Sequence, residues 1–491
     1  MIGALLLIPA LCALAAFFIR NDRARRILLL GAALAHALIT AAAWAMRPAP
    51  VLNGWLTLDA LGLLFLSMTS ALFLAASVYA FTFLGREKRQ EGEEISDPMD
   101  LFPNSPETVF TGCLLFFLAT MTLVAASHHL GLLWAAVEAT TLASAPLIYF
   151  HRNPRSLEAT WKYLMVCSVG IALALLGNFF FSVAGTDPVG ERIGLLLPDL
   201  IARGGQLQAP WLKAAFLFFL VGYGTKMGLA PLHTWLPDAH SESPSLVSAL
   251  LSGALLNCAF LALLRVTQVM DAAALGGFAR GLFLFFGLFS ITLAMVFILG
   301  QRDYKRLLAY SSVEHMGILA IGMGLGSGAA WAVVFHAVNH SLSKAGLFLT
   351  AGNILSRCRT KTIAEISGLL RAMPVSGALW VAGLLAITGF PPFGTFLSEF
   401  AILKEAVAQG RFLLAGYFLL MLALIFMDMS GSFLAMAQGP APAAFQGRES
   451  RGSYLPPALL LLAVLVLGLY MHPAVMSGFE EAARLIGGVP R

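Results

Sequence analysis

Charge is scarce in this chain. Only 12% of its 491 residues are Asp, Glu, Lys or Arg, whereas 59% are hydrophobic. Soluble globular proteins carry about 25% charged residues. A chain so poor in charge cannot cover a water-exposed surface, so we expect lipid to be its main solvent. Apolar runs of about 20 residues, the length that crosses a bilayer, recur along the sequence.

Motifs for cofactors are also lacking. The five cysteines form no CxxC pair, and no Cys/His group has metal-ligand spacing. There is no Walker loop and no GxGxxG motif after a strand pattern. We therefore expect no metal and no cofactor in this chain, and no nucleic-acid partner despite the net charge of +5. Any driving energy would come from an ion gradient or from partner subunits.

The apolar segments predict an all-α polytopic membrane protein with about 14 transmembrane helices. Arginines follow the first segment and none precedes it, the reverse of a signal peptide. The N-terminus is therefore expected outside, and an even number of crossings returns the C-terminus to the same side. The predicted spans are 2–20, 27–46, 57–85, 107–127, 129–150, 159–184, 211–231, 245–265, 281–300, 306–326, 328–356, 374–408, 412–437 and 455–473.

This topology places twice as many Lys and Arg residues in inner loops as in outer loops, as the positive-inside rule requires. Four basic residues remain inside predicted spans, and all are lysines: Lys162, Lys226, Lys344 and Lys404. A buried lysine can lose its proton, whereas arginine stays charged. The set indicates proton handling at membrane depth. For Lys162, snorkelling to the interface is an equal alternative.

Two segments 161 residues apart, 228–238 and 389–399, share the pattern G-x-x-P-x-x-T-aromatic-L-x-acid. Each contains a helix breaker, Pro231 or Pro392. Interrupted helices at matching places in two halves of a transporter indicate its transport path. The predicted topology makes the two copies inverted; chance similarity is the alternative. The expected division is 1–106 for helices 1–3 and an inner loop, 107–265 for repeat one, 281–437 for repeat two, and 455–491 for the last helix.

Glu138 lies in the middle of a predicted span, where an unpaired carboxylate is costly. It should face inward beside a cation, and Lys226 is the best candidate. Such a pair keeps both groups charged, and its separation tends to neutralise both, which gives a switchable element. A static structural ion pair is the alternative.

His336, His340 and Lys344 are spaced four residues apart, so on a helix they form one stripe. Histidine gives and takes protons near neutral pH, which favours a relay through water. The alternative is that both histidines are buried structural residues whose hydrogen bonds are made within the core. A metal site is less favoured because HExxH and an obvious third ligand are absent. Glu399 belongs to the second repeat copy, and further candidates are Lys162, His233, Asp238, Asn257, His315 and Lys404, with His315 placed near the inner interface.

The stretches KMGLAPLHTWLPDAH, DYKRLLAYSSVEHMG, FHAVNHSLSKAGLFLTAG and GFPPFGTFLSEF resemble the antiporter-like proton-translocating subunits of respiratory complex I and of Mrp antiporters. LLSGALLNCA and SSVEHMG are most similar to the hydrogenase-4 component F type of group 4 nickel–iron hydrogenase and formate hydrogenlyase complexes. The resemblance covers roughly residues 107–437. It implies fourteen helices with two inverted five-helix repeats, each containing one broken helix.

Residue roles are also implied by the resemblance. Glu138 and Lys226 match the family's ion pair, and Lys344 matches its central proton-carrying lysine, with His336 and His340 as the wire. Glu399 matches the terminal titratable residue. Asn257 stands where many members have lysine, so a link from Lys226 to Lys344 would need water or nearby serines.

The function implied is a proton-translocating subunit of a multisubunit redox complex, a membrane-bound hydrogenase, in a bacterial or archaeal cell membrane. Its partners would be other membrane subunits and a peripheral hydrogenase-like arm that carries the NiFe centre and the Fe–S clusters. The alternatives are a Na⁺/H⁺ antiporter module of the Mrp type, a proton-coupled inorganic carbon uptake subunit, and a membrane scaffold for a hydrogenase.

Overall fold

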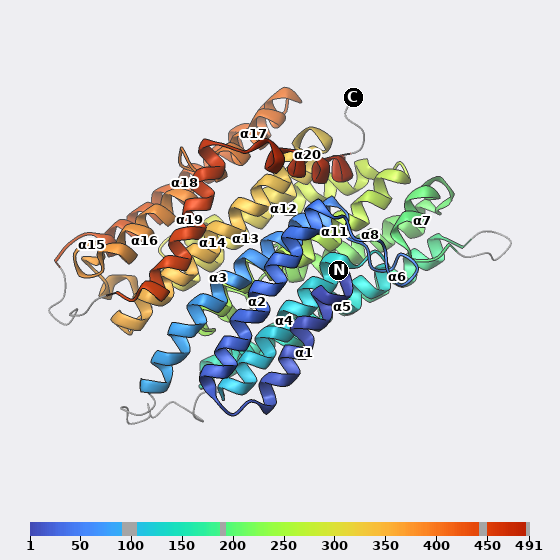
Figure 1. The fold of residues 1–491 in the computed structure, drawn as a ribbon. Helices are drawn as coiled ribbons and strands as arrows, with labels where there is room; N and C mark the ends of the chain where they lie inside the picture. The colour runs from blue at the N-terminus through green and yellow to red at the C-terminus, as the bar shows by residue number, and fades with distance from the viewer. Residues whose placement is uncertain (91–105, 187–192, 441–448, 488–491) are drawn as a thin grey trace.

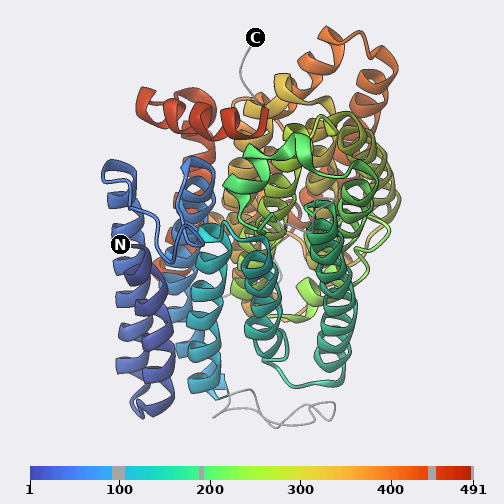
Figure 2. The same cartoon turned by 90° about the vertical axis from the view of Figure 1, so that its right-hand side faces the viewer.

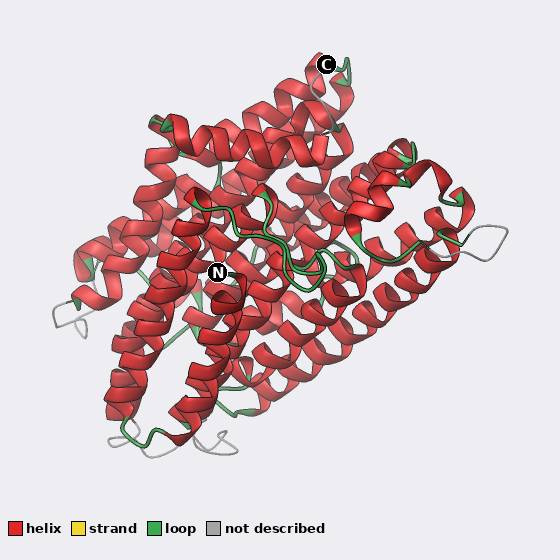
Figure 3. Cartoon of the chain, turned by 45° about the vertical axis from the view of Figure 1, so that its right-hand side comes forward, coloured by secondary structure: helices red, strands yellow, loops and turns green. Residues whose placement is uncertain are grey.

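The computed structural model describes residues 1–90, 106–186, 193–440 and 449–487. This part of the chain is a bundle of long, roughly parallel and antiparallel helices (Figures 1 and 2). Helix dominates the described residues, and β-pairing there is limited to four isolated bridges (Figure 3). The prediction of an all-α membrane protein is therefore confirmed.

The helical elements, in chain order, are α1 (Ile2–Phe18), α2 (Asp22–Ala45), α3 (Ala60–Gln90), α4 (Glu107–Ala126), α5 (Leu130–Ile148), α6 (Pro154–Ala184), α7 (Leu197–Ala202), η1 (Gly204–Gln206), α8 (Ala209–Met227), α9 (Trp235–Glu242), α10 (Ser245–Leu250), η2 (Leu251–Leu255), α11 (Leu256–Ala272), α12 (Gly276–Ile298), α13 (Tyr304–Leu325), η3 (Ser327–Ala329), α14 (Ala330–Cys358), η4 (Ile363–Glu365), α15 (Leu369–Ala372), α16 (Pro374–Ile387), α17 (Gly394–Ala408), α18 (Phe412–Ala437), α19 (Arg451–Leu469) and α20 (Pro473–Gly487).

Every predicted span overlaps a helix, and the span 374–408 is divided between α16 and α17. Within the described ranges, nine helices are long and apolar enough to cross a bilayer by themselves. The total of fourteen crossings remains a prediction. Local sequence sets the helix starts: Asp303 accepts hydrogen bonds from the first backbone amides of α13, and Asn153 and Ser156 form a capping box before α6.

The C-terminal region differs from the prediction. A further helix, α20, follows α19 and lies across one end of the bundle (Figures 1 and 2). It packs on α3 and α14, and Glu481 pairs with Arg47 at 2.6 Å. The prediction placed a single helix, 455–473, in the terminal segment 455–491, and α20 is a second helix there that the sequence did not indicate. The segment was missed because its apolar residues alternate with charges and are too few for a membrane span.

Both repeat segments interrupt a helix. Helix α8 ends at Gly228, whose φ of +88° gives the left-handed C-cap that glycine adopts readily, and α9 starts seven residues later. The second break, between α16 and α17, likewise begins with a left-handed glycine, Gly389. The peptide bond before Pro231 and the one before Pro392 are both cis. The two breaks, which were predicted from matching sequence, therefore also share their backbone conformation.

The two broken helices point in opposite directions along α13. Asp238 of α9 pairs with Arg306, in the first turn of α13, at 3.0 Å. Gln409, which ends α17, donates to the carbonyl of Leu325, the last residue of α13, at 2.7 Å. Since α9 and α17 reach opposite ends of one long helix, the second copy is inverted relative to the first, as expected.

The centre of the bundle is the segment Ser245–Ala272, whose apolar stretch is entirely buried. It is interrupted by the π-helical turn η2, which the sequence did not indicate. Such turns free backbone groups and are frequent at functional sites. Helices α10 and α14 pack closely, so the centre joins the two halves of the chain.

Candidate functional site

Two of the four lysines predicted at membrane depth are buried, Lys226 and Lys344, and both are completely inaccessible. Lys162 is 47% exposed and pairs with Glu158 and Asp238. Lys404 is exposed on α17. The side chains of Lys162 and Lys404 lie on outward faces of their helices, so burial in the protein interior distinguishes Lys226 and Lys344 from the other two.

Basic residues outside this set of four lysines are buried as well. Lys305, assigned to an inner loop, is buried and donates to the carbonyls of Ser241 and Ser243 at 3.1 and 2.6 Å. Arg265, assigned to an outer segment, is buried in α11 and makes a bidentate pair with Asp59 at 2.5 and 2.6 Å. A buried arginine is tolerated here because its guanidinium group makes two parallel hydrogen bonds to the carboxylate, so both charged groups are paired.

Glu138 and Lys226 are linked through a hydroxyl group. Lys226 Nζ donates to Thr141 Oγ1 at 2.6 Å and to the Tyr163 hydroxyl at 2.7 Å. Thr141 in turn donates to the Glu138 carboxylate at 3.2 Å, and Ser168 donates to its other oxygen at 2.8 Å. The predicted direct pair is thus a hydroxyl-bridged one, since Thr141 lies one helical turn beyond Glu138 and occupies the space between the charges.

Asn257 connects the first half with the second. Its side-chain amide donates to Gly253 O at 2.9 Å and to Ser341 Oγ at 2.8 Å. Ser341 lies on α14 between His340 and Lys344. The predicted dependence on a nearby serine is therefore matched by a contact. The oxygen Oδ1 of Asn257 is buried and makes no hydrogen bond within the described residues.

Lys344 is held by the neighbouring helix α13. Its Nζ donates to Leu308 O at 2.7 Å and makes a short hydrogen bond to Ser311 Oγ. The buried Glu314, one turn further along α13, interacts electrostatically with both Lys344 and Glu399. His315 was expected near the interface, but both it and its neighbour Glu314 are buried, because the face of α13 that carries them packs against α14.

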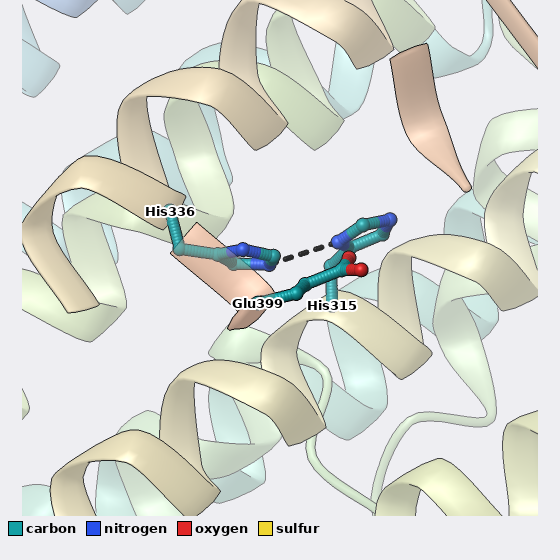
Figure 4. Close-up of side chains that lie close together, drawn as sticks. All are labelled: His315, His336 and Glu399. Carbon is teal, nitrogen blue, oxygen red and sulfur yellow. Dashed lines mark hydrogen bonds between the residues drawn. The ribbon is translucent and has the colours of Figure 1, made fainter. Parts of the chain in front are cut away.

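The histidines form a cluster across two helices. His315 Nδ1 and His336 Nε2 lie 2.9 Å apart, as the dashed line in Figure 4 marks. The His340 ring centroid is 4.9 Å from that of His315, and neither His340 nitrogen has a hydrogen-bond partner in the described structure. His315 therefore stands between the two histidines of the predicted stripe on α14. The histidine cluster therefore spans α13 and α14, whereas the predicted stripe lay on α14 alone.

Glu399 completes this cluster from the second broken helix. Its side chain is 6% exposed and points towards His315 and His336 (Figure 4). Gly389 has a φ of +62°, and a Cβ atom there would lie 2.0 Å from Glu399 Oε2, so any other residue would strain the backbone and displace the carboxyl group. Glu399 also lines a cavity of about 350 Å³ between α17 and α18, together with apolar residues such as Phe400 and Leu422. The carboxyl group therefore separates the histidines from this cavity.

The remaining predicted residues lie near one end of the bundle. His233 is buried close to the rings of Phe297 and Tyr310. Asp238 is part of an exposed network with Lys162 and Arg306 at 3.0 Å each. Neither residue contacts the central lysines directly. Their position agrees with the expected location beside the first break.

The described ligand-type side chains contain one group that could hold a metal ion, His315, His336 and Glu399, whose ligand atoms all lie within 4.8 Å of one another. The sequence revealed no third ligand because these residues come from three helices. Sequence reasoning also missed Thr141, Tyr163 and Ser311. The run Ser311-Ser312-Val313-Glu314-His315, polar within an apolar span, was the available signal for the α13 residues.

Comparison with known proteins gives the family. Residues 127–425 match the family described as NADH:quinone oxidoreductase/Mrp antiporter, TM. The chain belongs to this family. It is 36% identical over 434 residues to the hydrogenase-4 component F homolog of Methylacidiphilum infernorum, covering 87% of this chain and 88% of the relative. It is also 28% identical over 435 residues to NADH-quinone oxidoreductase subunit N of Desulforudis audaxviator, covering 83% and 80%.

Solved structures share the fold. A chain of the archaeal membrane-bound sulfane sulfur reductase aligns with a TM-score of 0.84 at 18% identity, covering 99% of this chain and 97% of that one. A chain of Thermus thermophilus respiratory complex I aligns with a TM-score of 0.81 at 23% identity, covering 99% and 100%. Both neighbours are subunits of multisubunit membrane complexes.

Proposed function

We propose that the chain is a proton-translocating subunit of a redox-driven membrane complex related to complex I, of the membrane-bound hydrogenase type. The observation that carries this proposal is the pair of fully buried lysines, Lys226 and Lys344, each embedded in titratable or hydroxyl groups. Buried ionisable groups are expensive in a membrane and are retained for function. The likeness to a hydrogenase-4 component F homolog supports the hydrogenase type.

Each residue has a proposed part in the transfer. Lys226 holds a proton while Glu138, through Thr141, stabilises its charge. A loss of that stabilisation would drive the proton from Lys226 towards Asn257 and Ser341, with water completing the join. Lys344 would receive the charge and pass it through His340, His315 and His336 to Glu399, because imidazoles both accept and donate protons.

The surroundings of the chain follow from the same proposal. Other membrane subunits and a peripheral hydrogenase-like arm would accompany it, and the NiFe centre and Fe–S clusters would lie in that arm. The chain would reside in the cell membrane of a bacterium or archaeon, with both termini outside. The two repeats, 107–265 and 281–437, would each supply half of the path.

The test is a lysine substitution in the intact complex. Lys344→Met keeps the side-chain length but removes the proton carrier, and Lys404→Met is the matched control because that lysine is exposed. Proton uptake into vesicles is measured against electron transfer. We expect Lys344→Met to abolish pumping and Lys404→Met to leave it intact. Unchanged pumping in Lys344→Met refutes the proposal.

The same assay separates the other functions. Sodium-dependent transport without an electron donor would replace this proposal with the Mrp-type antiporter, a family to which the chain also shows structural likeness. Loss of assembly alone after substitution of Lys226, Lys344 and Glu399 would indicate a scaffold. Dependence on inorganic carbon would indicate the uptake subunit.

A further inference from the structure

We propose that His315, His336 and Glu399 form a binding site for one divalent transition-metal ion of the zinc type. The three residues come from α13, α14 and α17, and their side chains converge in Figure 4. Two imidazoles and one carboxylate are a ligand set that zinc uses in proteins. Their ligand atoms already lie within 4.8 Å of one another in the buried core.

The distances are close to those a metal needs. Zinc binds imidazole nitrogen at about 2.0–2.1 Å and carboxylate oxygen at about 2.0–2.2 Å, so tetrahedral ligands lie roughly 3.3 Å apart. The two nitrogens, now 2.9 Å apart, would separate slightly. Glu399 would move inward by roughly an ångström and a half at most, which rotation of its side chain can supply.

The outer atoms of both rings are already fixed. His315 Nε2 lies 3.0 Å from Ile387 O, and His336 Nδ1 lies 2.9 Å from Ser398 Oγ. A carbonyl only accepts, so His315 Nε2 carries its hydrogen and Nδ1 offers a lone pair. Metal-binding histidines are held in this manner, with the second nitrogen donating to a carbonyl or another oxygen. The inner nitrogens, His315 Nδ1 and His336 Nε2, therefore face one another and Glu399.

Protons balance on metal binding. Ser398 Oγ donates its hydrogen to Thr395 O at 2.7 Å, so it accepts from His336 Nδ1, and Nε2 of that ring offers a lone pair. Neither histidine therefore has to gain or lose a proton when the metal binds. A protonated Glu399 releases one proton to solvent.

Charge also favours a cation here. Glu399 is a buried carboxyl group, and no lysine or arginine pairs with it among the residues that the structure describes. Its nearest acidic neighbour in electrostatic terms is Glu314. Glu399 supplies one negative charge to the metal, and Glu314 supplies a second that Lys344 partly offsets. Because the same three residues are on the proposed proton route, a bound metal would block that route; this consequence alone rests on the proposed function.

The experiment uses Co²⁺ as a spectroscopic probe on the purified full chain in detergent. We expect one Co²⁺ per chain, with the visible absorption of a four-coordinate site, and displacement by Zn²⁺. His336→Gln and Glu399→Gln should weaken binding at least about 100-fold, and Ser398→Ala about 10-fold, since outer-shell losses cost 10–100-fold. His340→Gln is the matched control, equally buried but outside the ligand set, and should bind as the native chain does.

The outcomes separate clearly. Binding with a six-coordinate spectrum, or equal binding by His336→Gln and the native chain, means an adventitious ion only and overturns the site. The spectrum of the native chain decides by itself if a variant does not fold. Lys344→Met should bind Co²⁺ at least as tightly as the native chain, because it removes a nearby positive charge. The metal site and the pumping function can therefore fail independently.

Discussion

Thr141→Val tests the hydroxyl bridge between the two charges of the first half. Valine has nearly the same shape as threonine but cannot hydrogen-bond. The substitution removes the bond from Lys226 Nζ at 2.6 Å and the bond to the Glu138 carboxylate at 3.2 Å. Among the residues that the structure describes, the Tyr163 hydroxyl would be the remaining direct hydrogen-bond partner of Lys226.

The expected magnitude follows from those two bonds. A hydrogen bond to a charged group contributes about 1.5–3 kcal/mol, so the charged pair loses about 3 kcal/mol or more. Since about 1.4 kcal/mol is a factor of ten, the state in which Glu138 and Lys226 are both charged becomes at least about 100-fold less populated relative to the state in which both are neutral. The lysine then starts the cycle without its proton, and pumping should fall below about a tenth of the native value.

The assay is the ratio of protons pumped to electrons transferred in vesicles that contain the intact complex. Thr141→Ser restores the hydroxyl and should restore most of the ratio. Thr140→Val is the matched control, because Thr140 is equally buried on α5 but its hydroxyl, in the described part of the chain, donates to Val137 O at 2.6 Å and contacts neither charged group. A native ratio in Thr141→Val, with the fold retained, would refute the bridge. An equal loss in Thr140→Val would point to general damage.

Two other substitutions test the close packing at the second break and the buried ion pair of Arg265. Gly389→Ala puts a Cβ 2.0 Å from the Glu399 carboxylate, so both thermal stability and pumping should fall further than in Gly410→Ala, whose φ is similarly positive but whose Cβ meets nothing within 4 Å. Arg265→Gln leaves Asp59, 23% exposed, without its bidentate partner. Burial raises the pKa of Asp59, but Arg265 holds it well below its usual range. We expect a loss of about 3 kcal/mol. That contribution is complete above about pH 4 and disappears as the pH falls below it, so the thermal unfolding temperatures of variant and native chain should converge in acid.

The fold was largely predictable because hydropathy marks membrane helices directly. Every predicted span meets a helix, and the repeated proline segments located both breaks. Helix α20 could not be found in this way, since an amphipathic helix at a bundle end has no long apolar run. The π-helical turn at 251–255 was equally hidden, because its residues read as continuous helix.

The sequence predicted which residue types form the site, but only some of the contacts between those residues. Hydropathy places a residue along a span but does not say which face of the helix it occupies. This is why Lys404 is exposed while Lys305, assigned to a loop, is buried. Contacts between helices, such as His315 with His336, depend on how α13 and α14 rotate against each other. No spacing within one helix contains that information.

The two halves surround their lysines with different chemistry. A single hydroxyl group, that of Thr141, lies between Lys226 and the Glu138 carboxylate, so a change in the charge of Glu138 changes the stability of the charged form of Lys226. Lys344 bonds to a carbonyl and a hydroxyl group and lies in the same buried core as three histidines, a setting suited to passing a proton onward. Asn257 of the first half contacts Ser341 of the second, and an amide neither takes nor releases a proton at ordinary pH. Under the proposed function, the first half therefore acts on the second through charge and water.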